Sequence, residues 1–198
     1  CGQSCIAAKR IIVHEKIAEK FSKKFAELAE KLVVGNPSDK NTTTGPLVNE
    51  KAAKDIEMHV KDAVQKGAKV LTGGKRLNGA FYAPTVLTNV TDNMDVVKEE
   101  MFGPVAPIIV VKSDEEALTI ANKTNFGLGG SVWTKDLKRG EAIARRLEAG
   151  SVFVNSIVKS DPRMPFGGIK ESGLGRELSH WALREFANIK GLSVYEHK

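Results

Sequence analysis

The sequence predicts an α/β protein in which a mainly parallel sheet forms the middle of three layers, with helices on both faces. Short apolar runs alternate with amphipathic segments along most of the chain, as strands and helices do in such folds. Residues suited to helix ends stand at several of the boundaries. The 198 residues, 41% of them hydrophobic, are enough to bury one good core, so we expect one globular domain.

The first half of the chain is expected to contain two helices and four strands. An apolar run at residues 10–14 predicts the first strand. The inward face of the helix after it is expected to consist of Ile17, Phe21, Phe25, Leu28 and Leu32. Asn49 is suited to cap a second helix, whose inward residues would be Ile56, Val60 and Val64. The other strands are predicted at residues 69–72 and 81–90, on either side of a Gly73-Gly74 turn, and at residues 107–112.

Helices and strands are expected to alternate more regularly in the second half of the chain. Helices are predicted at residues 114–123 and 137–148, and strands at residues 130–134 and 151–155. Asp114 and Asp136 stand at N-cap positions, and Gly150 stands at a C-cap position. A glycine-rich loop follows at residues 165–175, and it contains neither of the glycine patterns that cradle phosphates, so its glycines are expected to be structural. Arg176 and Glu177 should start a last helix at residues 176–187, before a strand at residues 191–195.

The composition argues against several classes of function. Lys and Arg number 30 against 24 Asp and Glu, but the basic residues are scattered, so no nucleic-acid binding is expected. No run of about 18 apolar residues exists, so no membrane span is expected. The four histidines lie far apart, and Cys1 and Cys5 match neither a zinc spacing nor a disulfide framework. We therefore expect no metal site, and a reducing compartment, the cytoplasm.

Cys5 is a candidate nucleophile on its residue context alone. It follows a turn of small residues and precedes a run that could open a helical turn, whose N–H groups would stabilise a thiolate. The competing interpretation is a small buried hydrophobic residue beside Ile6 and Ala7. A third interpretation makes Cys1 the N-terminal nucleophile of an amidohydrolase, which would require antiparallel layers of strands.

The motif GQSCIAA at residues 2–8 resembles the active-site cysteine signature of the aldehyde dehydrogenase superfamily, with Cys5 at the position of the nucleophile. Four further segments resemble motifs of that family and occur in the same order. They are EEMFGPV at residues 99–105, NFGL at 125–128 with VWT at 132–134, GSVFVN at 150–155, and PFGGIKESG at 165–173. The resemblance covers the whole chain and implies the catalytic domain of such an enzyme.

This resemblance implies a mechanism and a role for each matching residue. The Cys5 thiolate would attack an aldehyde, hydride would pass to NAD or NADP, and water would release the thioester as a carboxylic acid. The backbone N–H of Cys5 would provide one oxyanion contact. Glu100 matches the glutamate that binds the nicotinamide ribose, and Phe102 matches the aromatic residue beside the nicotinamide ring. Phe166 matches an aromatic wall of the substrate funnel, although plain core packing is the alternative.

The loop at residues 155–164, NSIVKSDPRM, matches the substrate entrance of these enzymes and resembles the succinate-semialdehyde dehydrogenase group. Ser160 matches a serine that holds the far carboxylate of the substrate, and Arg163 could assist electrostatically. The alternative for both residues is a solvated loop. Lactaldehyde and glyceraldehyde are the alternative substrates. Ala7 stands where some relatives carry a second, redox-active cysteine, so no such switch is expected.

The resemblance also implies a domain organisation. Residues 1–188 are expected to form the catalytic domain, and residues 189–198 a C-terminal strand or tail through which a homo-oligomer assembles. The cofactor-binding domain, the oxyanion asparagine and the glutamate general base are expected upstream of residue 1. The isolated chain is therefore expected to be inactive alone, as an oligomerising fragment of the catalytic half.

Overall fold

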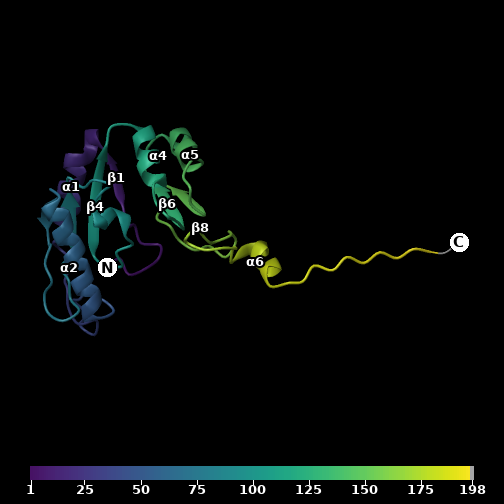
Figure 1. Cartoon of the computed structure of the whole chain (residues 1–198), viewed down its shortest axis with the longest axis horizontal. Coiled ribbons are helices and arrows are strands. Elements are labelled where there is room, and N and C mark those ends of the chain that lie inside the picture. Colours follow the sequence, from purple (N-terminus) through teal and green to yellow (C-terminus); the bar gives the residue numbers. More distant parts are fainter. Residues whose placement is uncertain (197–198) are drawn as a thin grey trace. The chain divides into compact units, whose positions relative to one another are not determined.

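The computed structural model describes residues 1–196, which form two compact units (Figure 1). The first unit is Cys1–Thr124, and the second begins at Asn125. The sequence had suggested one domain over residues 1–188. Each unit combines helices and strands, and the predicted α/β class is confirmed.

The first unit is built on a four-stranded sheet with the order β1-β4-β3-β2. Its strands are β1 (Ile11–His14), β4 (Val105–Val111), β3 (Thr85–Thr88) and β2 (Lys69–Thr72). β4 pairs in parallel with both β1 and β3, and β2 joins the edge antiparallel to β3. The sheet is therefore mainly parallel, as predicted, and the predicted strand at residues 81–90 is limited to Thr85–Thr88.

Two helices cover opposite faces of this sheet. Successive side chains of a strand point to opposite faces, and in β4 Ile108 packs with helix α1 (Glu15–Ala29) whereas Ile109 packs with helix α2 (Glu50–Gln65). In β3, Val86 likewise packs on the α1 side of the sheet and Leu87 on the α2 side. The first unit thus has the three predicted layers of helix, sheet and helix.

The buried face of α1 differs from the predicted one. Small residues, Ala18, Ser22 and Ala26, are the buried ones, whereas Ile17 is 58% exposed. Leu28 and Leu32 are also exposed, and Leu32 lies beyond the end of the helix. The small side chains repeat every four residues and let the helix approach the sheet closely, with Phe21 and Phe25 half-buried beside them.

The predicted N-cap chemistry holds for one helix of the first unit and not for another. The Asn49 side chain accepts from Ala52 N–H at 2.8 Å at the start of α2, although Val64 near its end is exposed. Helix α4 (Asp114–Asn122) is capped by Ser113 and not by Asp114, because the serine hydroxyl accepts from Glu116 N–H and leaves Asp114 in the acidic first turn. The short helix α3 spans Asp95–Lys98.

The second unit contains a βαβ segment. Strand β6 (Gly129–Val132) and strand β7 (Ser151–Val154) pair in parallel and are joined through helix α5 (Leu137–Ala144). Strands β5 (Phe126–Gly127) and β8 (Ile169–Lys170) form a separate antiparallel pair. Asp136 caps α5 as predicted, but the helix ends at Ala144, so the prediction of Gly150 as its C-cap was wrong. A side chain at Gly150 would overlap the carbonyl of Gly167, which explains the glycine by close backbone packing.

The chain end departs from the predicted elements. Helix α6 spans Ser179–Glu185, so Arg176 and Glu177 precede it and the prediction that they start it was wrong. Residues 187–196 belong to no helix or strand. The expected strand at residues 191–195 would pair with another subunit and stays a prediction, and residues 197–198 of the expected tail lie outside the described residues. Within residues 1–196, no helix combines the length and apolar character that spanning a bilayer requires.

Candidate active site

The loop that carries Cys5, residues 1–8, is here called the nucleophile loop. Cys5 is exposed in it and lies in a turn in which Ala7 N–H donates to the Ser4 carbonyl at 3.0 Å. The turn does not continue into a helix. The structure therefore contradicts the buried-core interpretation of Cys5 and leaves its thiol reachable by a substrate.

Gln3 ties the nucleophile loop to a distant segment. Its side-chain amide donates to the Pro46 carbonyl at 3.0 Å and accepts from Val48 N–H at 2.9 Å. Gly2 has φ of 77°, and a side chain there would overlap the carbonyl of Gly103. The loop thus packs directly against the EEMFGPV motif, and a glycine is required at this contact.

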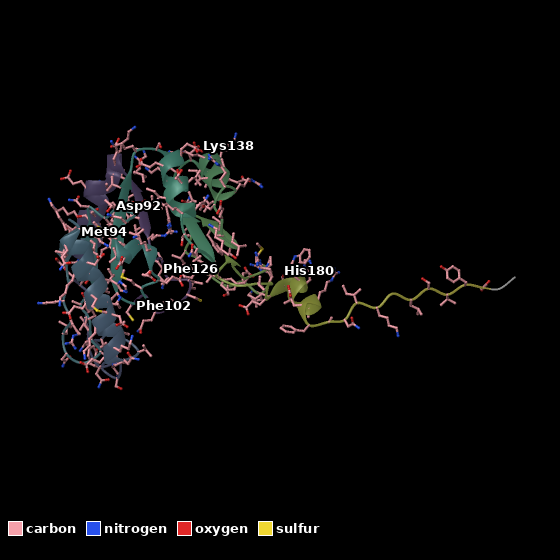
Figure 2. All side chains as sticks on the ribbon, viewed as in Figure 1. Asp92, Met94, Phe102, Phe126, Lys138 and His180 are labelled. Carbon is pink, nitrogen blue, oxygen red and sulfur yellow. The ribbon has the colours of Figure 1, made fainter. Side chains whose placement is uncertain are left out.

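Glu100 and Phe102 flank buried residues of that motif. Met101 is buried, and a side chain at Gly103 would overlap the Ile56 side chain in the core. Because both neighbours of Phe102 are held inward, its ring is directed outward and is 43% exposed (Figure 2). Glu100 is exposed as well, so its carboxylate can accept hydrogen bonds from a ligand.

Lys9 joins these predicted residues into one cluster. Its ammonium donates to the carbonyls of Gly2 and Ser4, both at 3.0 Å, and lies 4.0 Å from the centroid of the Phe102 ring. Burial lowers the pKa of Lys9, while the negative charges of Glu100 and of the Cys5 thiolate act to raise it. Sequence motifs alone did not single out this lysine, although the cations Lys9 and Arg10 directly after GQSCIAA were a usable signal.

The predicted substrate residues lie in the second unit. Phe166 is half-buried, and its backbone exchanges two hydrogen bonds with Glu177, at 2.8 and 2.7 Å. Ser160 and Arg163 are exposed on one loop. The Arg163 guanidinium binds both oxygens of Asp161, at 2.9 and 2.7 Å, and these hydrogen bonds hold the pKa of the Asp161 carboxyl well below its usual range. Arg163 is therefore already paired with an anion.

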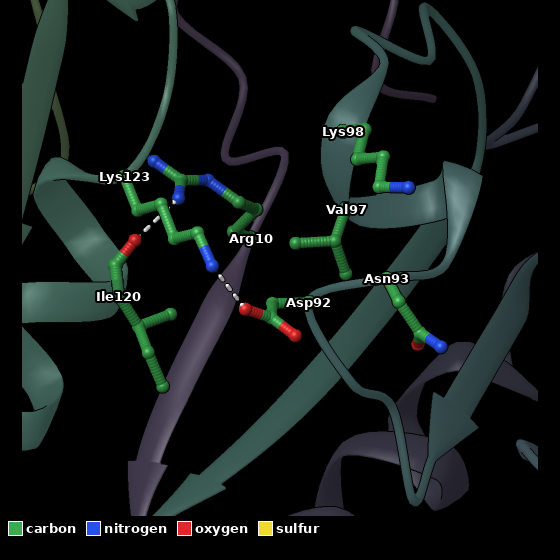
Figure 3. Close-up of a pocket in the computed structure, with 7 residues that line it drawn as sticks. All are labelled: Arg10, Asp92, Asn93, Val97, Lys98, Ile120 and Lys123. Atoms are coloured by element: carbon green, nitrogen blue, oxygen red, sulfur yellow. Dashed lines mark hydrogen bonds and ion pairs between the residues drawn. The ribbon is translucent and has the colours of Figure 1, made fainter.

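A cavity of about 260 Å³ in the first unit contains none of the predicted site residues (Figure 3). The Arg10 guanidinium donates there to the carbonyls of Ile120 and Ala121, both at 2.8 Å, and Lys123 pairs with Asp92 at 2.6 Å. These bonds tie the strand after the nucleophile loop to the end of α4. The other lining residues are Asn93, Val97 and Lys98.

A metal centre is not evident in the part of the chain that the structure describes, since residues 1–196 contain no group of three His, Cys, Asp or Glu placed to hold an ion. Cys1 and Cys5 are both free thiols. The parallel pairing of β4 with β1 and β3 also argues against the antiparallel layers that an N-terminal nucleophile at Cys1 would require. The residues present suit thiol chemistry at Cys5.

Comparison with known proteins identifies the family. The model of the aldehyde dehydrogenase family matches residues 1–192. The chain belongs to this family. An aldehyde dehydrogenase of Paenarthrobacter nicotinovorans is 47% identical over 191 residues, covering 96% of this chain and 42% of that protein. The NADP(+) succinate-semialdehyde dehydrogenase of Deinococcus radiodurans is 44% identical over 199 residues, covering 100% of this chain and 42% of that protein.

Solved structures agree with this assignment. The crystal structure of succinate-semialdehyde dehydrogenase from Burkholderia pseudomallei matches with a TM-score of 0.89 and 45% identity, over 92% of this chain and 38% of that one. The aldehyde dehydrogenase fold predicted from the motifs is thereby confirmed. The chain spans about two-fifths of the length of the relatives that it matches.

Proposed function

We propose that a larger protein containing this chain oxidises an aldehyde to a carboxylic acid with NAD+ or NADP+, and that Cys5 is its nucleophile. The observation that carries the proposal is the exposed Cys5, held in the signature loop of the family and packed against the motif of Glu100 and Phe102. A thiol suits the reaction because the thiolate attacks the carbonyl readily and later leaves the thioester readily.

The chain's own residues perform distinct parts of this reaction. The Cys5 sulfur bonds to the aldehyde carbon, and the Cys5 backbone N–H provides one contact to the resulting oxyanion. Loss of hydride from the thiohemiacetal gives a thioester, and water then releases the acid and restores the thiol. The dinucleotide supplies the hydride acceptor when it is bound. The exposed Glu100 carboxylate fits the hydroxyls of a ribose, and the exposed part of the Phe102 ring fits the flat nicotinamide.

Succinate semialdehyde is the proposed substrate. Ser160 and Arg163 lie on one exposed loop, so a hydroxyl and a cation are available for the far carboxylate. Asp161 accepts hydrogen bonds from Nε and Nη2 of Arg163, along one edge of the guanidinium, yet an arginine has five N–H donors, and the remaining ones can bind a second carboxylate. Phe166, half-buried beside this loop in sequence, supplies the proposed apolar wall. The relatives named succinate-semialdehyde dehydrogenases support this choice over lactaldehyde and glyceraldehyde.

The remaining parts of the enzyme are proposed to lie outside this chain. A dinucleotide-binding domain, an oxyanion asparagine and a glutamate base would complete the site, so the chain alone should show no turnover. Large apolar side chains of the second unit support a larger assembly, since Trp133 is 65% and Ile157 is 69% exposed. Residues 189–198 would join subunits of a homo-oligomer, and the two free thiols suit the cytoplasm.

Steady-state kinetics of the larger protein test the proposal. We expect kcat/KM for succinate semialdehyde to exceed that for lactaldehyde, and Cys5→Ser to lower kcat by about 10⁴-fold or more. Cys1→Ser is the matched control and should retain activity. Equal kcat/KM values for charged and neutral aldehydes would contradict the substrate, and full activity of Cys5→Ser would contradict the nucleophile.

A further inference from the structure

The turn at residues 78–81 of the first unit carries a chemically reactive pair of residues. Asn78 is the only asparagine in the sequence that is followed by glycine. Both Asn78 and Gly79 are exposed. The N–H of Phe81 donates to the Asn78 carbonyl at 2.9 Å and closes the turn, and Gly79 has φ of 50°, which favours glycine.

The surroundings of this pair leave its two polar groups free. A side chain built at Gly79 would meet no atom within 4 Å, so this backbone faces open space. Within residues 1–196, neither the Asn78 side chain nor the Gly79 N–H takes part in a hydrogen bond. Because glycine has no side chain to block the approach, the Asn78 amide can reach the nitrogen of the next residue.

We propose that Asn78 is a site of spontaneous deamidation, with water as the co-reactant. The Gly79 nitrogen bonds to Cγ of Asn78, the Cγ–Nδ2 bond breaks, and the proton of the Gly79 N–H leaves with the amide nitrogen as ammonia. Water then opens the resulting cyclic imide at either of its two carbonyls. One opening gives aspartate, and the other gives isoaspartate, in which the main chain runs through the former side chain. This inference goes beyond the proposed function and does not depend on it.

The same turn supports the nucleophile loop through two successive hydrogen bonds. The Ala80 carbonyl, inside the turn, accepts from the N–H of the buried Leu47 at 2.9 Å. The next residue, Val48, donates its N–H to the Gln3 side chain of the nucleophile loop at 2.9 Å. Isoaspartate at residue 78 adds a methylene to the main chain and moves the Ala80 carbonyl, so the Leu47 N–H loses its partner. Aspartate keeps the length of the main chain and should leave this support intact.

The first test is peptide mass spectrometry of the larger protein after incubation at mildly acidic and mildly alkaline pH. Deamidation is identified by the mass gained when OH replaces NH2, and chromatography separates aspartate peptides from isoaspartate peptides. Asn41, also exposed in a loop of the first unit, is the internal comparison, because the branched side chain of Thr42 hinders the attacking nitrogen. Asn78→Ser is the matched control, since serine suits a turn but cannot form the imide.

We expect Asn78 to deamidate at least about tenfold faster than Asn41, and to give both products. The rate should rise with pH, because the nitrogen attacks once it has lost its proton. Asn78→Ser should gain no mass at this position. Equal rates at Asn78 and Asn41, or a rate at Asn78 that does not respond to pH, would overturn the proposal.

Hydrogen exchange tests the consequence for the nucleophile loop. The loss of one hydrogen bond should make the Leu47 amide exchange about fivefold faster in the isoaspartate form. Incubated Asn78→Ser, and freshly prepared Asn78→Asp, should match the fresh parent. Unchanged exchange at residues 47–48 in the isoaspartate form would overturn the link to the loop. Equally fast exchange in incubated Asn78→Ser would also overturn it, because the change would then arise at another residue.

Discussion

Replacing Arg10 by Met should destabilise the first unit through the end of α4. The guanidinium donates two hydrogen bonds of 2.8 Å to the carbonyls of Ile120 and Ala121, which are half-buried at the C-terminal end of that helix. Hydrogen bonds to a charged group contribute about 1.5 kcal/mol or more each, so the loss should be about 3 kcal/mol. The methionine fills much of the same volume, which keeps a cavity term small.

Native-state hydrogen exchange of the amides in β1 and β4 measures this loss locally. Both tryptophans lie in the second unit, so their fluorescence would not report the first unit. A loss of about 3 kcal/mol corresponds to exchange faster by about two orders of magnitude. Arg145→Met is the control, because Arg145, the residue directly after α5, forms an exposed ion pair with Glu141 and should change stability by less than about 0.5 kcal/mol. A change below about 1 kcal/mol for Arg10→Met would refute the role assigned to these bonds.

Two further predictions concern Tyr82 and Asp161. The Tyr82 hydroxyl is the one buried side-chain polar atom without a hydrogen-bond partner among residues 1–196, and burial, with the charge of Glu57, raises its pKa to about 12. Tyr82→Phe should therefore be neutral or stabilising by up to about 1 kcal/mol in urea unfolding, and a loss above about 1.5 kcal/mol would reveal a missed partner. Arg163 lowers the pKa of the Asp161 carboxyl. The stability that this ion pair contributes is therefore fully present above the pKa of the carboxyl in the unfolded chain, and it is lost as the pH falls through the lower pKa of the folded protein. NMR titration of Arg163→Gln should raise the Asp161 midpoint toward about 3.9, with part of the depression kept by the backbone N–H of residue 163, and an unmoved midpoint would contradict the assigned cause.

Local chemistry predicted much of the fold. The strand at residues 69–72 and the caps Asn49 and Asp136 depend on neighbouring residues, and the structure places all three as expected. The inward face of α1 depends on how closely the helix approaches the sheet, which small residues such as Ala18 decide and hydrophobicity alone does not reveal. Similarly, Gly150 is required by its contact with the distant Gly167 backbone rather than by a helix end.

The residues of the candidate site also differ in how far the sequence could predict them. Cys5, Glu100 and Phe102 were reached through motifs, since residue context alone left Cys5 open to a core role. Lys9 escaped notice because its contact with Phe102 joins segments that are far apart in the chain. The pairing of Arg163 with Asp161 joins close neighbours and could have been foreseen from their spacing.

The most direct test of the account is to find the residue that carries the substrate during turnover. The larger protein would be acid-quenched while it oxidises succinate semialdehyde, and its peptides would be mapped by mass spectrometry for a succinyl thioester. The account predicts the adduct on the peptide that contains Cys5, and its disappearance in Cys5→Ser. An adduct on Cys1, or sustained oxidation of the aldehyde by Cys5→Ser, would contradict the claim that Cys5 is the nucleophile.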